Sequence, residues 1–390
     1  MKAIVLVIDS FGIGAMPDAS LYGDVGANTA LHICETISGP KWPNLRRLGL
    51  GNASKVLGPQ LPGCEAVENP LASYGVMQER SPGKDTTTGH WEISGVVLEK
   101  AFTTFPANCP SFPEELIADF ESRINRAVIG NYAASGTTII QDLGPEHLRT
   151  GSPIVYTSSD SVFQIAAHEE VISVESLYDI CVVARELCDS CHVGRVIARP
   201  FVGSPGNFTR TERRRDFSIP PPSNTILDHL QLHGVETVGI GKIGDIFCER
   251  GLSESHHDKG NSACLERSVE VMRRRGDSPR FVFLNLVDTD MMYGHRRDVQ
   301  GYFDSVSGID AATPEIFATL DWGDTAIITA DHGCDPTFRG TDHTREYVPL
   351  LCYKKGKRAG SLGIRSQFSD IACNLAREFG VPAMPIGESF

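Results

Sequence analysis

Two carboxylate–imidazole pairs lie close together late in the chain and could hold a metal ion. Asp331 and His332 follow the apolar run 325–330, and the second pair, Asp342-His343, begins eleven positions after the first. Oxygen and imidazole ligands suit manganese, zinc or magnesium-like ions better than they suit a thiolate cluster. A polar loop after a core strand would explain one such pair. Two pairs in one loop system favour a metal site.

Two further apolar runs also end in carboxylates. Asp9 follows the run 3–8, and Asp290 follows the run 281–287, with His295 five positions later. Open α/β sheets hold their ligands beyond the carboxyl ends of parallel strands, although Asp9 alone could simply cap the next turn. Six ligands would serve two ions at three each and leave positions for substrate oxygens. The candidate metal ligands are therefore Asp9, Asp290, His295, Asp331, His332 and His343.

A threonine cluster in the stretch 81–94 could carry a phosphate group. Gly83 permits a sharp turn, Asp85 can cap a helix, and the threonines 86–88 follow at the expected helix start. A helix N-terminus favours phosphate, and a threonine hydroxyl becomes a nucleophile when a base or a metal stabilises its alkoxide. The alternative is that these threonines only cap the helix. Sequence spacing does not choose among the three.

The elements that must position these residues alternate between strand and helix. Buried-type strands at 3–8, 281–287 and 325–330, with helices such as 261–275 between them, predict an α/β fold with a doubly wound, mostly parallel sheet. A segment with a different pattern of helices and strands interrupts this alternation, and both of its boundaries are rich in proline. We expect a core of residues 1–98 and 221–390 with an inserted α+β domain at 99–220.

Composition narrows the classes of function. The 390 residues carry a net charge of −13, which argues against a nucleic-acid partner. No apolar run approaches the ~20 residues of a membrane span, and the N-terminus lacks a signal-peptide pattern. We therefore expect a cytoplasmic protein, and no protein partner is indicated. The eleven cysteines suggest reduced thiols, and the C-x-x-C-H string at 188–192 is explained best by chance.

A G-x-G-x-x-G string at 239–244 is a weak dinucleotide signal. It follows a strand, but the short segment 245–251 follows it where a full helix is required. The more useful feature is Lys242, which this glycine-rich loop would present.

Taken together, these stretches resemble the phosphopentomutase family of the alkaline phosphatase superfamily over nearly the full chain. No single string is specific, but their combination is. The matching stretches are D-S-F-G-I-G-A-M-P-D-A (Asp9–Ala19), G-K-D-T-T-T-G-H-W-E-I (Gly83–Ile93), Tyr156–Glu170, Val193–Gly203, Asn285–Asp298, A-D-H-G-C-D-P (Ala330–Pro336) and G-T-D-H-T-R-E-Y-V-P (Gly340–Pro349).

The resemblance implies an alkaline phosphatase-like core with a cap, two Mn²⁺ ions, and interconversion of ribose 1-phosphate and ribose 5-phosphate or their 2-deoxy equivalents. It implies that Thr86 carries the phosphate and that a sugar bisphosphate such as glucose 1,6-bisphosphate activates the enzyme. One ion would be held by Asp9, Asp331 and His332, and the other by Asp290, His295 and His343. The implied substrate contacts are Ser158, Asp160, Arg195, Ile197, Arg210 and Lys242.

Four positions depart from the family pattern. Tyr132 and Thr138 stand where the family usually has lysine and glutamate, Thr289 replaces an aromatic residue, and Cys334 replaces an asparagine. None of them removes an expected ligand or the threonine.

Three other functions are alternatives. A metal-dependent phosphatase or phosphodiesterase on the same core would release free phosphate. A cofactor-independent phosphoglycerate mutase is a weaker alternative, because its motifs do not match the insert. A catalytically silent metal-binding protein would keep the ions without phosphorylating a threonine.

Overall fold

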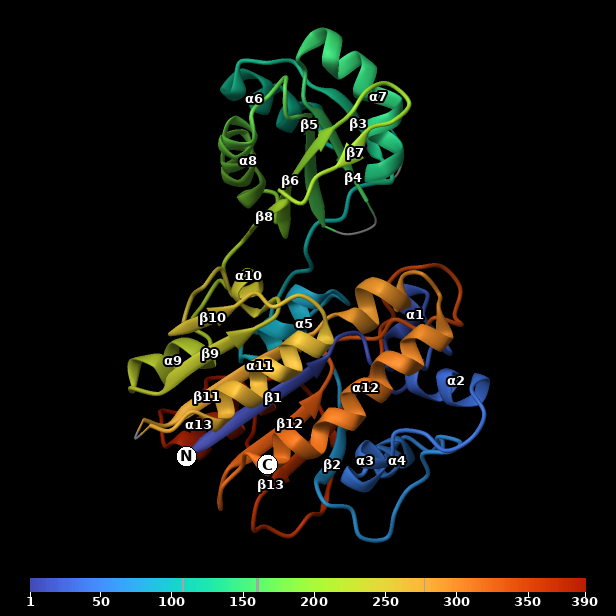
Figure 1. Ribbon diagram of the computed structural model, residues 1–390, viewed down its shortest axis with the longest axis vertical. Coiled ribbons are helices and arrows are strands. Elements are labelled where there is room, and N and C mark those ends of the chain that lie inside the picture. Colours follow the sequence, from blue (N-terminus) through green and yellow to red (C-terminus); the bar gives the residue numbers. More distant parts are fainter. Residues whose placement is uncertain (107–108, 159–160, 277) are drawn as a thin grey trace. The chain divides into compact units, whose positions relative to one another are not determined.

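The chain forms two compact units, each with its own sheet. The computed structural model describes residues 1–106, 109–158, 161–276 and 278–390 (Figure 1). The larger unit combines Met1–Lys100 with Pro220–Phe390, and the second unit, called the insert below, is Ala101–Ile219.

The larger unit is built on an eight-stranded, mostly parallel sheet. Its strand order is β10-β9-β11-β1-β12-β13-β2-β14, and β13 runs against its neighbours β12 and β2, while the other pairings are parallel. The apolar β1 lies between β11 and β12 and is buried on both faces, as its sequence predicts. The strands are β1 (Lys2–Ile8), β2 (Ser73–Met77), β9 (Glu236–Ile240), β10 (Glu254–His256), β11 (Arg280–Leu286), β12 (Thr325–Thr329), β13 (Val348–Lys354) and β14 (Ser361–Arg365).

Helices of this unit pack in two groups. α11 contacts α12, which also contacts α2 and α3, whereas α13 contacts α9 and α5, and α5 contacts α10. This is the layered α/β arrangement that the alternating pattern predicts. The helices are α1 (Ala19–Tyr22), α2 (Thr29–Thr36), α3 (Pro43–Leu48), α4 (Leu50–Val56), α5 (Thr86–Ile93), α9 (Ile226–Leu232), α10 (Ile243–Phe247), α11 (Asn261–Arg273), the π-helix η1 (Thr289–Gly294), α12 (Val299–Ala318) and α13 (Asp370–Phe379).

The insert has a six-stranded sheet of mixed direction. Its order is β3-β4-β5-β6-β7, and β8 pairs with β6 beside this path. The β3–β4 and β5–β6 pairs are parallel, and the others are antiparallel. Its elements are α6 (Glu114–Ile124), β3 (Ile129–Ala133), α7 (Gly136–Thr150), β4 (Ile154–Thr157), β5 (Val162–His168), α8 (Val174–Asp189), β6 (Arg195–Val202), β7 (Thr209–Arg210) and β8 (Arg215–Ser218).

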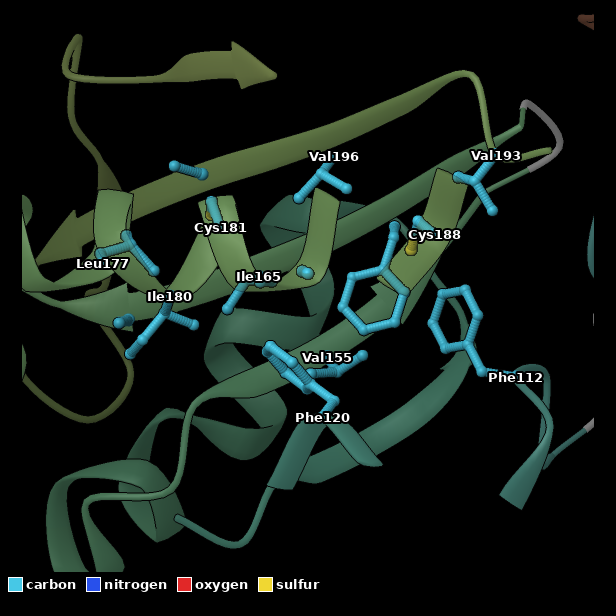
Figure 2. Close-up of a cluster of buried hydrophobic side chains, with 14 of the residues drawn as sticks. Phe112, Phe120, Val155, Ile165, Leu177, Ile180, Cys181, Cys188, Val193 and Val196 are labelled. Atoms are coloured by element: carbon cyan, nitrogen blue, oxygen red, sulfur yellow. The ribbon is translucent and has the colours of Figure 1, made fainter. Parts of the chain in front are cut away.

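An apolar core between the sheet and helices α6 and α8 holds the insert together. Figure 2 shows Phe112, Phe120 and Ile165 gathered in this cluster, with Cys188 among them. Burial raises the pKa of the Cys188 thiol to about 12, so the first cysteine of the C-x-x-C-H string acts as a small apolar residue. Cys188 and Cys191 are both free thiols.

In the part of the chain that the structure describes, no helix has both the length and the apolarity that a membrane crossing requires. The cytoplasmic location stays a prediction.

Candidate active site

Three adjacent strands bring the predicted carboxylates to one edge of the large sheet. Asp9 follows the last residue of β1, Asp331 lies two residues beyond β12, and Asp290 lies in the π-helix η1 after β11. Because β1 pairs in parallel with both β11 and β12, their carboxyl ends meet at the same edge. All three carboxylates are buried.

The first candidate ion position lies between Asp9, Asp331 and His332. One ligand atom from each of these three residues lies within 4.8 Å of the other two. His332 Nε2 is 3.5 Å from Asp9 Oδ1 and 3.4 Å from Asp331 Oδ2. The same nitrogen lies 3.2 Å from Thr86 Oγ1, so the predicted threonine hydroxyl adjoins this position.

The second candidate position lies around Asp290. His295 Nε2 is 3.4 Å from Asp290 Oδ2, and His343 Nε2 is 3.2 Å from Asp290 Oδ1. The two Nε2 atoms lie only 3.1 Å apart. Asp290, His332 and His343 also form a group within 4.8 Å, so His332 stands between the two positions.

The hydrogen bonds of the three histidines fit metal binding. Nδ1 of His295 bonds to the carbonyl of Thr341 at 2.7 Å, and Nδ1 of His343 bonds to that of Lys84 at 2.8 Å. Nδ1 of His332 bonds to the carbonyl of Gly333 at 3.1 Å. A carbonyl only accepts hydrogen bonds, so each Nδ1 carries the hydrogen and each Nε2 keeps a lone pair for a metal. Burial also lowers the pKa of His332, which favours its neutral form.

The carboxylates fit metal binding as well. Asp9 Oδ1, Asp290 Oδ1 and Asp331 Oδ2 are buried and have no hydrogen-bond partner among the described residues. Burial, together with the charges of Asp331 and Asp290, raises the pKa of Asp9 to about 8, although Lys242 opposes this shift. Buried oxygens without partners are costly. A cation at each position would satisfy them.

Thr86 differs from its two neighbours in its surroundings. It is the first residue of helix α5 and is half-buried, whereas Thr87 and Thr88 are buried. The Thr88 hydroxyl is already bonded to Asp85 Oδ2 at 2.6 Å, and Asp85 Oδ1 caps the Thr88 amide at 3.1 Å. Of these two hydroxyls, that of Thr86 lies beside a candidate metal ligand, whereas that of Thr88 caps the helix.

A glycine allows helix α5 to approach the metal ligands. A Cβ atom at Gly89 would lie 2.2 Å from the backbone oxygen of Asp331, much closer than any side chain tolerates. Gly89 therefore sets the spacing between the helix that carries Thr86 and the loop that carries Asp331.

Sequence reasoning assigned no role to His90, which links the threonine to both carboxylates of the first position. Its Nδ1 bonds to the Thr86 carbonyl at 2.9 Å and lies 3.1 Å from Asp331 Oδ2. Its Nε2 is 3.1 Å from the amide nitrogen of Asn285, which also donates to Asp9 Oδ2 at 2.9 Å. One available signal was that His90 lies four residues after Thr86, on the same face of a helix.

Arg345 was also missed, and it fixes the loop that leads into helix α5. Its Nη1 donates to Glu79 Oε2 at 2.6 Å and to the carbonyls of Ser81 at 2.9 Å and Gly83 at 2.6 Å. Its Nη2 donates to Asp18 Oδ2 at 3.0 Å. Glu79 and Arg345 are both buried, and their pairing spans 266 positions, so no local pattern could have revealed it.

The predicted substrate contacts are divided between the two units. Lys242 lies in the larger unit at the start of α10, near enough to Asp9 to influence its pKa. Ser158, Arg195, Ile197 and Arg210 lie in the insert. Asp160 lies outside the described residues. These six positions stay predictions.

Arg195 and Ile197 lie on strand β6, and Arg210 ends the short strand β7. Arg195 Nη1 is 3.7 Å from Asp216 Oδ2, and Arg214 binds the same carboxylate through two hydrogen bonds of 2.7 Å. The insert therefore carries a cluster of arginines around one acidic residue.

Comparison with known proteins agrees with this fold and with a metalloenzyme. The family described as "Metalloenzyme superfamily" matches residues 1–383 of this chain. The chain is therefore a metalloenzyme of this superfamily. Phosphopentomutase from Desulfitobacterium hafniense is 51% identical over 391 residues, covering 100% of this chain and 98% of that protein. Phosphopentomutase from Caldanaerobacter subterraneus is 50% identical over 395 residues, covering 100% and 97%. The chain belongs to the phosphopentomutase family and is an enzyme of the isomerase class.

Among solved structures, phosphoglycerate mutase from Leishmania mexicana aligns with 99% of this chain and 96% of its own, at 12% identity and a TM-score of 0.45.

Proposed function

We propose that the chain interconverts ribose 1-phosphate and ribose 5-phosphate, and the corresponding 2-deoxyribose phosphates, through a phosphothreonine at Thr86. The observation that carries this proposal is the 3.2 Å distance between Thr86 Oγ1 and His332 Nε2, which belongs to groups of side chains that could hold a metal ion. The relatives at 51% and 50% identity support the same activity.

Two Mn²⁺ ions would be held by Asp9, Asp331 and His332 and by Asp290, His295 and His343. When bound, they would neutralise the oxygens of the phosphoryl group in transfer and stabilise the threonine alkoxide. The protein supplies rigid ligands for them, since each histidine is oriented by a backbone carbonyl.

The reaction is a cycle on Thr86. Phospho-Thr86 gives its phosphoryl group to the free hydroxyl of a pentose monophosphate, which yields a 1,5-bisphosphate and leaves the threonine oxygen unmodified. The other phosphoryl group of the bisphosphate then returns to that oxygen, and the isomeric monophosphate leaves. The N-terminus of helix α5 favours the phosphate electrostatically.

The insert would serve as the cap domain and hold the sugar and its distal phosphate. The residues proposed for substrate binding are Ser158, Asp160, Arg195, Ile197, Arg210 and, from the larger unit, Lys242. Arginine forks match phosphate oxygens, which is the reason to assign Arg195 and Arg210 this role. A sugar bisphosphate such as glucose 1,6-bisphosphate would prime Thr86.

Incubation with ribose 1-phosphate and Mn²⁺ separates this activity from its nearest alternative. Formation of ribose 5-phosphate supports the mutase, and release of inorganic phosphate supports a metal-dependent phosphatase or phosphodiesterase. Replacing Thr86 by alanine should abolish the ribose 5-phosphate signal while metal content is retained. Turnover at the wild-type rate by Thr86→Ala would reject the phosphothreonine.

A further inference from the structure

Cys334 lies among the ligands of the second ion position. It follows the Asp331–Gly333 turn and is 2% exposed. Its Sγ, a carboxylate oxygen of Asp290 and a ring nitrogen of His295 all lie within 4.8 Å of one another. Among the described residues, it is the one cysteine that joins such a group.

The thiol is held in this place from several sides. The backbone nitrogen of Cys334 donates to the Ser10 carbonyl at 3.0 Å and to Thr29 Oγ1 at 3.2 Å. Its Sγ lies 3.7 Å from the Asp342 carbonyl oxygen, a weak hydrogen bond. A Cβ atom at Gly294 would lie 2.9 Å from the sulfur, so the thiol packs directly against the turn before His295.

The alternative is that Cys334 is a small apolar core residue, as buried cysteines commonly are. Its surroundings argue otherwise, because a carboxylate and an imidazole face it. Cys373 is a suitable comparison, because it is also buried but joins none of the candidate metal groups among the described residues. Its Sγ donates to the Ile386 carbonyl at 3.3 Å.

We propose that the Cys334 thiolate joins Asp290 and His295 as a ligand of the second ion position, and that this position therefore favours Zn²⁺ or Co²⁺ over Mn²⁺. Sulfur joined to imidazole and carboxylate is a donor set for these softer ions, whereas Mn²⁺ prefers oxygen. As the metal–sulfur bond forms, the thiol proton passes to solvent, and no oxidation is involved. The inference rests on the proposed function only in taking this position as a metal site.

Cobalt spectroscopy tests the sulfur ligand directly. We expect metal-free full-length protein titrated with Co²⁺ to develop a sulfur-to-cobalt charge-transfer absorption in the near ultraviolet. The absorption should persist in the matched control Cys373→Ser and disappear in Cys334→Ser. Its absence from the wild-type protein, which needs no variant, would overturn the proposal, and so would its persistence in Cys334→Ser.

Metal competition tests the preference. After dialysis against equal concentrations of Zn²⁺ and Mn²⁺, the Zn:Mn ratio bound to Cys334→Ser should be at least ~10-fold lower than that of the wild-type protein. An unchanged ratio would contradict the proposal. The two claims can fail separately. If the protein forms no ribose 5-phosphate but shows the cobalt absorption, the proposed function fails and the sulfur ligand stands. If it forms ribose 5-phosphate without the absorption, the sulfur ligand fails and the proposed function stands.

Discussion

Two carboxylates, one buried in the larger unit and one partly buried in the insert, have opposite electrostatic surroundings. Asp9 in the larger unit faces Asp331 and Asp290, and burial together with these charges raises its pKa to about 8. Asp216 in the insert faces arginines. Burial opposes its charge too, but hydrogen bonds from Arg214 and the nearby charges lower its pKa.

The difference shows where each unit obtains its positive charge. The insert carries its own cations, because Arg195 and Arg214 already pair with Asp216. The larger unit gathers three carboxylates, each with one oxygen that has no hydrogen-bond partner among the described residues, although histidine nitrogens lie 3.1–3.5 Å from these oxygens. A site of this kind needs a cation from solution.

Removing one carboxylate from the larger unit should have the largest effect. We expect Asp331→Asn to reduce bound metal from two ions to one and to lower turnover by ~10³-fold, because an ion contributes several kcal/mol of transition-state stabilisation. Mass spectrometry measures the metal content, and the ribose 1-phosphate assay measures the turnover. The matched variant Asp216→Asn should keep both ions, and a loss of metal there would break the comparison.

Moving a helix of the larger unit tests the same site without changing its charge. Gly89→Ala should lower turnover by ~10²-fold, because the new methyl group would displace Thr86 from the ligands by a fraction of an ångström or more. Gly308→Ala in helix α12 meets open space and should instead stabilise the protein by about 0.5–1 kcal/mol. Steady-state kinetics and thermal unfolding distinguish the two. Wild-type turnover by Gly89→Ala would show that this spacing is unimportant.

The smallest effect is expected in the pH dependence of the insert. Since the folded pKa of Asp216 lies below its ordinary value, its ion pairs stabilise the insert above about pH 4 and are lost as the pH falls through the folded pKa. Hydrogen exchange of strands β6 and β8 should be slower in the wild-type protein than in Asp216→Asn above that pH. The two proteins should converge in more acidic solution. A difference in exchange rate between the two proteins that stays the same at every pH would exclude a contribution from the ionisation of Asp216.

Much of the larger unit follows from local sequence. Apolar β-branched runs predict its central strands, and the parallel sheet brings the carboxyl ends of β1, β11 and β12 together, so Asp9, Asp290 and Asp331 could be grouped from their positions alone. Glycine also marks a helix boundary in this unit, because Gly49, with a φ of 108°, ends α3 and begins α4.

The rest depends on contacts between distant parts of the chain. The sequence could not choose among the threonines 86–88, because the choice depends on which hydroxyl faces His332 when α5 packs against the β12 loop. The same is true of Arg345, whose partner Glu79 is 266 positions away. The nearness of Cys334 to His295 likewise depends on how two loops fold against each other.

The central claim is that two ions bind beside Thr86. Crystals of the full chain, freed of other metals and grown with Mn²⁺ as the sole added metal, test it most directly when measured at a wavelength where manganese scatters anomalously. The account predicts two anomalous peaks, one on Asp9, Asp331 and His332 and the other on Asp290, His295 and His343. A single peak, or manganese bound only elsewhere, would contradict it.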